Sequence, residues 1–255
     1  MVYATQDIEE QSQRMPVTQA ARRTAEQFAL QHPSPEKAER VRLNTLAVWV
    51  VNDYLQLMDI PTELSAGDSW NPVMRLSDDV ADLVVTGLGC LECRPILPGE
   101  QSCTIPPEVW FDRIGYMVVR IEESFREATL LGFMPPSEEP LEQVEVAQLR
   151  SLDEFLDYIG RLEDGVAFLE GDDPVAVQVR CLLEMRSRSE IVAQLERIYR
   201  TREEYEWRSA GGEVLAGSDA GGGFDREEID DGDGELEDLA ESLLEKLAEI
   251  WGESV

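Results

Sequence analysis

The feature that most constrains the fold is a change of hydrophobic period between residues 60 and 72. Residues 17–60 follow helical spacing, and Leu43–Met58 is apolar on most sides. After the turn-forming stretch SAGDSWNP (65–72), short β-type segments recur up to residue 149, and helical spacing returns from Ser151. This order of helices, strands and helices predicts an α+β fold rather than alternating βα units.

The central region, residues 72–149, predicts an antiparallel sheet of about five or six short strands. VADLVV (80–85) and CLECRPIL (90–97) flank the turn TGLG, as in a β-hairpin, and a second strand pair is joined around Ser124-Phe125. The apolar run LAVWVV (46–51) is read as part of a long helix that starts at Ser34-Pro35, with a strand as the alternative. We therefore expect N-terminal helices (17–60), a sheet, and C-terminal helices (151–208).

The C-terminal sequence predicts a different organisation from the rest. Residues 1–208 are expected to form one α+β domain, and the Gly-, Ser- and Asp-rich residues 209–234 a flexible acidic linker. Residues 235–251 predict an amphipathic helix on this tether. Its apolar stripe packs either on its own domain or on another protein, so we predict partner contacts at Leu243, Leu247, Ile250 and Trp251.

Charge excludes some classes of partner. The chain has 22 Lys and Arg against 53 Asp and Glu, a formal net charge of −31. An acidic surface is repelled by nucleic-acid phosphate and by anionic lipid, so we expect neither nucleic-acid nor membrane binding. No apolar run is long enough to span a bilayer and no secretory signal is readable, which predicts a cytoplasmic protein. The charge does not exclude a protein partner with a basic surface.

Three of the four cysteines fall in GLGCLECRPILPGEQSC (87–103), which allows a metal site, a redox pair or strand thiols. Cys90 and Cys93 are an odd number of residues apart on a predicted strand, so their side chains point to opposite faces. Cys93 is expected on the inner face with Leu91, and Cys103 diagonally across the following turn. We interpret these cysteines as strand thiols. The alternative is a metal-binding or redox-sensing protein that uses Cys93 and Cys103.

Other chemistry has little support in the sequence. The only histidine, His32, precedes a proline at a helix boundary, and no phosphate-binding loop is present. The acidic run that starts at Asp231 lacks the glycine and the glutamate that a calcium loop requires at its sixth and twelfth positions. We predict no catalytic residue, no cofactor and no metal.

Four segments resemble a cyanobacterial family, domain of unknown function 1822 (DUF1822). They are NTLAVWVVNDYLQLMDI (44–60), DSWNPVMRLSDDVADL (68–83), GLGCLECRPILPG (87–99) and IPPEVWFDRIGYMVVRIEESFREATLLGFMP (105–135). The resemblance brings no catalytic residues. It implies a role in a regulatory circuit, since genes of this family lie beside those of sigma factors and signalling proteins. We therefore expect a non-enzymatic regulatory or adaptor protein, with a sigma factor or a signalling protein as its partner.

Overall fold

The computed structural model describes residues 12–109, 113–137, 141–183, 185, 187–209 and 233–252, with side chains undescribed in 199–209 and 233–238. The chain divides into two compact units, Met1–Ile159 and Gly160–Val255. The expected linker, 209–234, lies almost wholly outside the described residues. The predicted single domain over residues 1–208 stays a prediction.

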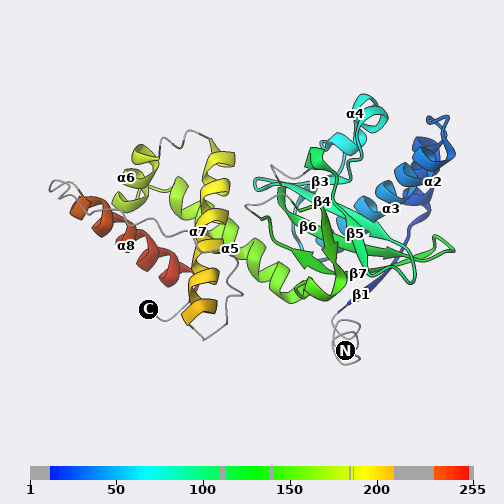
Figure 1. Cartoon of the computed structure of the whole chain (residues 1–255). Coiled ribbons are helices and arrows are strands. Elements are labelled where there is room, and N and C mark those ends of the chain that lie inside the picture. Colours follow the sequence, from blue (N-terminus) through cyan, green and yellow to red (C-terminus); the bar gives the residue numbers. More distant parts are fainter. Residues whose placement is uncertain are drawn as a thin grey trace, which may run out of the picture. The chain divides into compact units, whose positions relative to one another are not determined.

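The predicted α+β class is confirmed, and the sheet belongs to the first unit (Figure 1). Six strands form it in the spatial order β1-β7-β6-β4-β3-β2. Their bounds are β1 (Gln13–Pro16), β2 (Thr62–Glu63), β3 (Asp82–Val85), β4 (Gly89–Ile96), β6 (Arg113–Ile121) and β7 (Glu127–Met134). A separate two-stranded ribbon consists of β5 (Ser102–Thr104) and β8 (Gln143–Glu145).

The prediction of a wholly antiparallel sheet is wrong at its centre, because β4 and β6 run parallel. The predicted hairpins β3–β4 and β6–β7 are present. After β4, however, the chain does not fold back beside it. It enters β5, which pairs with β8, and then returns to the sheet as β6 in the same direction as β4. The edge strand β1, which pairs with β7, has no counterpart among the predicted strands.

The helices are α2 (Gln19–Ala29), α3 (Pro35–Leu57), α4 (Pro72–Ser77), α5 (Leu152–Glu170), α6 (Pro174–Leu182), α7 (Arg188–Ser209) and α8 (Asp233–Ile250). The N-terminal and C-terminal helices lie in the predicted helical regions, whereas α4 lies in the region predicted as sheet. Ser34 caps α3 and Pro35 lies in its first turn, so LAVWVV is helical and the strand alternative is wrong. Among the helices that the structure describes, none is both long enough and apolar enough to cross a bilayer.

Both faces of the six-stranded sheet are covered. On one face α3 packs against β4 and β6, and Phe133 of β7 contacts Phe155 of α5 with ring centroids 5.1 Å apart. On the other face Ile96 of β4 and Val118 of β6 share a hydrophobic cluster with Cys103 of the ribbon. Because both faces of the sheet are covered, β4 has no face toward solvent. Its charged residues are therefore buried as well.

The second unit is helical. Within it α8 packs against α6, and the close approach of α5 to α7 depends on Gly165, where a Cβ atom would lie 2.9 Å from a methyl carbon of Leu195. Leu169, Leu195 and Leu247 are fully buried in this unit. The amphipathic spacing predicted for 235–251 therefore corresponds to a helix that packs on its own unit.

Candidate functional site

A buried network of charged residues links β4 to β6. The Glu92 side chain is 0% exposed, and its two oxygens lie 2.7 Å from Arg94 Nη2 and 3.0 Å from Arg113 Nε. The backbone N–H of Ala81 also donates to Glu92 Oε1, at 2.8 Å. Burial lowers the pKa of Arg113, but Glu92, Asp82 and Cys90 together outweigh this effect and raise it, with Glu92 contributing most of the three. One buried carboxylate is therefore shared by two guanidinium groups inside the fold, and Asp79 supplies a second negative charge to Arg94.

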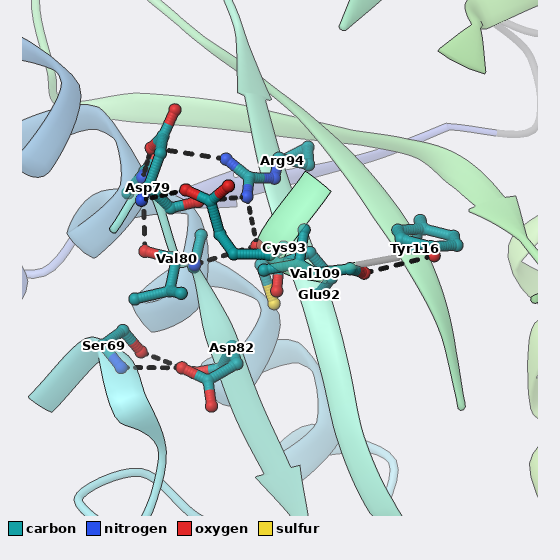
Figure 2. A network of polar contacts seen from close by, with 12 residues as sticks. Ser69, Asp79, Val80, Asp82, Glu92, Cys93, Arg94, Val109 and Tyr116 are labelled. Carbon is teal, nitrogen blue, oxygen red and sulfur yellow. Dashed lines mark hydrogen bonds and ion pairs between the residues drawn. The ribbon is translucent and has the colours of Figure 1, made fainter. Parts of the chain in front are cut away.

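The network continues from Arg94 to the loop before β3 (Figure 2). The Arg94 guanidinium lies 3.5 Å from Asp79 Oδ1 and donates to the Asp79 carbonyl. Asn44 of α3 donates to the same Asp79 oxygen at 2.7 Å and to the Val80 carbonyl at 3.2 Å. These bonds connect the long helix, the loop and the central strand.

A second part of the network holds the segment before α4. Asp82 of β3 is 1% exposed and accepts from the backbone N–H groups of Asp68 at 2.8 Å and Ser69 at 2.7 Å. The Ser69 hydroxyl donates to the Asp82 carbonyl at 2.7 Å (Figure 2). Gly67 permits this approach, since a Cβ atom there would lie 2.9 Å from that carbonyl oxygen. The segment DSWNP is therefore fixed to the sheet by hydrogen bonds.

Arg75 of α4 completes this arrangement. It is 4% exposed, donates to the Ser69 carbonyl and to Gln31 Oε1 at 3.0 Å each, and lies 3.7 Å from the centre of the Phe28 ring. Burial lowers the pKa of Arg75. An adjoining cavity of about 10 Å³ has space for one water molecule at most. Both oxygens of Glu92 and of Asp82 are occupied by donors. The bonds of Glu92 connect β4 to β6 and to the residue before β3, whereas those of Asp82 and Arg75 fix α4 and its preceding loop.

An amphipathic helix turns its apolar residues inward and its charged residues outward, and α4 does the reverse. Its charged residue Arg75 points into the protein, whereas Val73 and Leu76 are 70% and 64% exposed. Leu30, beside the Gln31 that Arg75 binds, is 76% exposed. Sequence reasoning missed this surface, which we call the α4 surface (Leu30, Val73 and Leu76). The pattern Val-x-Arg-Leu (73–76) places apolar and charged residues together on one helix. It does not show which side of the helix is buried, and only the network around Arg75 does.

The thiols are separated. No register shift interrupts the pairing from Leu91 to Ile96, so Cys93 and Ile96, three residues apart, point to opposite faces of β4. Cys103 clusters with Ile96 and so lies across the strand from Cys93, not diagonal to it on one face. Burial raises the pKa of Cys93 well above its usual value and that of Cys103 to about 11. In the part of the chain described, no three His, Cys, Asp or Glu side chains are placed to hold a metal ion.

The predicted partner contacts of the tail lie within the C-terminal unit. Leu243 and Leu247 are 7% and 0% exposed, whereas Ile250 and Trp251 are half-buried. The Trp251 indole N–H donates to the carbonyl of Arg161 at 3.1 Å, and the Arg161 guanidinium lies 5.8 Å from the centre of the Trp251 ring. Their role in binding a partner stays a prediction, and it would require α8 to leave this position.

The fold and the network define an α+β protein with a two-sided central sheet and a buried ionic cluster. The chain belongs to the family described as protein of unknown function (DUF1822), whose model matches residues 15–207. No curated protein and no solved structure matches the chain. The family match spans every residue of the network and of the α4 surface.

Proposed function

We propose that this protein is a non-enzymatic regulatory or adaptor protein that acts by binding another protein. The observation that carries the proposal is the α4 surface. A buried arginine with two exposed aliphatic neighbours on one short helix is an arrangement that the stability of the monomer alone does not favour. Exposed apolar groups of this kind mark binding surfaces when they are held in place.

Rigidity supports this interpretation. The hydrogen bonds of Arg75, Ser69 and Asp82 hold α4 before any partner arrives. A surface held in its bound conformation loses less conformational entropy on association, which increases affinity. The network would therefore act at a distance, by presenting Val73 and Leu76 in a fixed orientation.

The family resemblance and the charge suggest the kind of partner. A sigma factor or a signalling protein of a cyanobacterial regulatory circuit would meet the chain in the cytoplasm. The basic surface of a sigma factor complements a net charge of −31 and would accelerate association. Release of α8 would add Leu243, Leu247, Ile250 and Trp251 as a second set of contacts.

The test is the double variant Val73→Ser, Leu76→Ser. Proteins captured by the wild-type chain are identified by mass spectrometry, and the purified partner is then titrated by calorimetry. We expect the double variant to bind at least about tenfold more weakly, because two aliphatic side chains leave the interface. Its unfolding free energy should change by at most about 0.5 kcal/mol, because both side chains are exposed.

The matched control uses exposed apolar residues elsewhere. Leu57 and Met58, 66% and 42% exposed at the end of α3, are replaced by serine in a second double variant. This control should keep full affinity. Equal affinity for both double variants would refute the proposed role of the α4 surface.

The thiol-based alternative, with Cys93 and Cys103 as a metal or redox pair, makes a different prediction. Such a pair would react quickly with a thiol reagent in the native protein or copurify with zinc or iron. Burial and raised pKa values at both cysteines favour slow reaction instead, with the exposed Cys181 reacting first. Stoichiometric metal in the purified protein would support the alternative.

A further inference from the structure

A groove of about 220 Å³ lies between the N-terminal helices and the turn that joins β6 to β7. It is separate from the buried network and from the α4 surface. Side chains from three elements line it: Arg22 and Glu26 of α2, Arg42 and Leu46 of α3, and Ser124 and Phe125 of the turn. Its volume is below the range of about 300–1,000 Å³ typical of small-molecule pockets, so it suits one or two side chains of a peptide.

The turn between β6 and β7 contains Phe125 in a backbone conformation that a bulky residue does not favour. The Phe125 N–H donates to the Glu122 carbonyl at 2.8 Å, and the Glu122 N–H donates to the Glu127 carbonyl at 3.2 Å. Phe125 has φ = 52°, the left-handed conformation that glycine normally supplies in such hairpins. A bulky residue there costs about 1–2 kcal/mol. Glycine would close the same turn without this cost, so the presence of the ring at the groove needs another explanation.

The charge around the groove is opposite to that of the whole chain. Two arginines and one glutamate line the groove, and the segments that supply its lining, 12–46 and 122–127, together carry seven Lys and Arg against six Glu, a net charge of +1, whereas the chain as a whole carries −31. Arg42 is held by Glu26 at 3.1 Å and by Glu39. Arg22 is exposed and has no carboxylate partner among the described residues. The groove thus combines an exposed guanidinium, a guanidinium fixed by two carboxylates and an aromatic ring.

We propose that this groove binds an acidic peptide segment of a partner protein. A carboxylate of the peptide pairs with Arg22, and an adjacent apolar side chain of the peptide packs on the half-buried ring of Phe125. Charge complementarity selects this occupant, because the local surplus of arginine attracts carboxylates over the short range that survives screening by salt. This inference uses a different surface from the proposed function and stands independently of it.

The experiment measures fluorescence anisotropy with two labelled peptides at about 0.15 M salt. One peptide alternates Asp and Glu around a central Leu-Phe pair, and the other replaces every acid by its amide. The full-length protein should bind the acidic peptide saturably and the amide peptide at least about tenfold more weakly, because a charge-assisted hydrogen bond is lost. Equal binding of both peptides, or no binding of either, would overturn the proposal.

Two variants separate recognition from folding. Arg22→Gln should weaken binding of the acidic peptide about tenfold, whereas Arg23→Gln, the same change at an exposed neighbour that does not line the groove, should leave it unchanged. Phe125→Gly should weaken binding while keeping or raising the unfolding midpoint, because the strained residue is removed. Equal losses at Arg22 and Arg23 would mean a net-charge effect only and would overturn the proposal, as would full binding by Phe125→Gly. Competition by inorganic phosphate as strong as by unlabelled acidic peptide would assign the groove to small anions and would also overturn it.

Discussion

The two faces of strand β4 are buried to the same degree by different means. Leu91 and Cys93 are both 0% exposed on the face that α3 covers, whereas Glu92 and Arg94 are 0% and 3% exposed on the face that the β5–β8 ribbon covers. Apolar packing tolerates small changes of volume at a modest cost. A buried ion pair leaves an uncompensated charge when one partner is removed. Equal burial therefore does not imply equal sensitivity, and this difference can be measured.

The largest expected effect is that of Glu92→Gln. The substitution removes the carboxylate that Arg94 and Arg113 share, so we expect a loss of about 3–5 kcal/mol in the free energy of unfolding. Urea denaturation at neutral pH measures it. The control is Glu249→Gln, which removes a 77% exposed partner of Lys246 and should cost at most about 0.5 kcal/mol. A loss below about 1 kcal/mol for Glu92→Gln would remove the distinction between the two faces.

The second effect is a loss of stability in alkali, to which one thiol on each face contributes. The pKa of Cys103 is about 11 in the folded state against an ordinary value of 9.0, and that of Cys93 is raised in the same direction. The unfolded chain therefore loses a thiol proton at a lower pH than the folded chain. This contribution is whole below about pH 9 and is lost as the pH rises to about 11, by roughly 2–3 kcal/mol for Cys103.

Urea denaturation repeated across this pH range measures how steeply the free energy of unfolding falls with pH. The variant Cys103→Ala should show a shallower decline than the wild type, because one titrating group is absent. Identical slopes for the two proteins would contradict the raised pKa of this thiol.

The smallest effect is expected on the apolar face, for Cys93→Ala. Cys93 Sγ makes only a weak contact, 3.7 Å long, to the Leu91 carbonyl, so its loss removes mainly packing. We expect a cost of about 1 kcal/mol, again by urea denaturation. A cost similar to that of Glu92→Gln would mean that burial rather than charge governs this strand.

Much of the fold could be predicted because its signals are local. The start of α3 at Ser34-Pro35, the turn between β3 and β4, and the reciprocal bonds between Ser151 and Glu154 each depend on a few neighbouring residues. The pairing of β5 with β8 and of β1 with β7 joins distant segments, and no local pattern records it.

The candidate site was missed for a related reason. The alternation in CLECRPIL predicts Leu91 and Cys93 on the inner face, which leaves Glu92 and Arg94 on the opposite face of the strand. The second face is buried only because the ribbon covers it, and the ribbon is formed by residues far along the chain. The burial of the charged residues of β4 therefore could not be predicted without knowing that the β5–β8 ribbon covers them.

The edge strand β1 also has a consequence for biosynthesis. Gln13 pairs with Leu130, 117 residues later, so β1 has no partner until β7 has been made. At roughly 5–20 residues per second this interval lasts roughly 6–25 s. During that time Met15, 4% exposed in the finished protein, is open to chaperones and to other nascent chains. This edge of the sheet can therefore close only after more than a hundred further residues have been made.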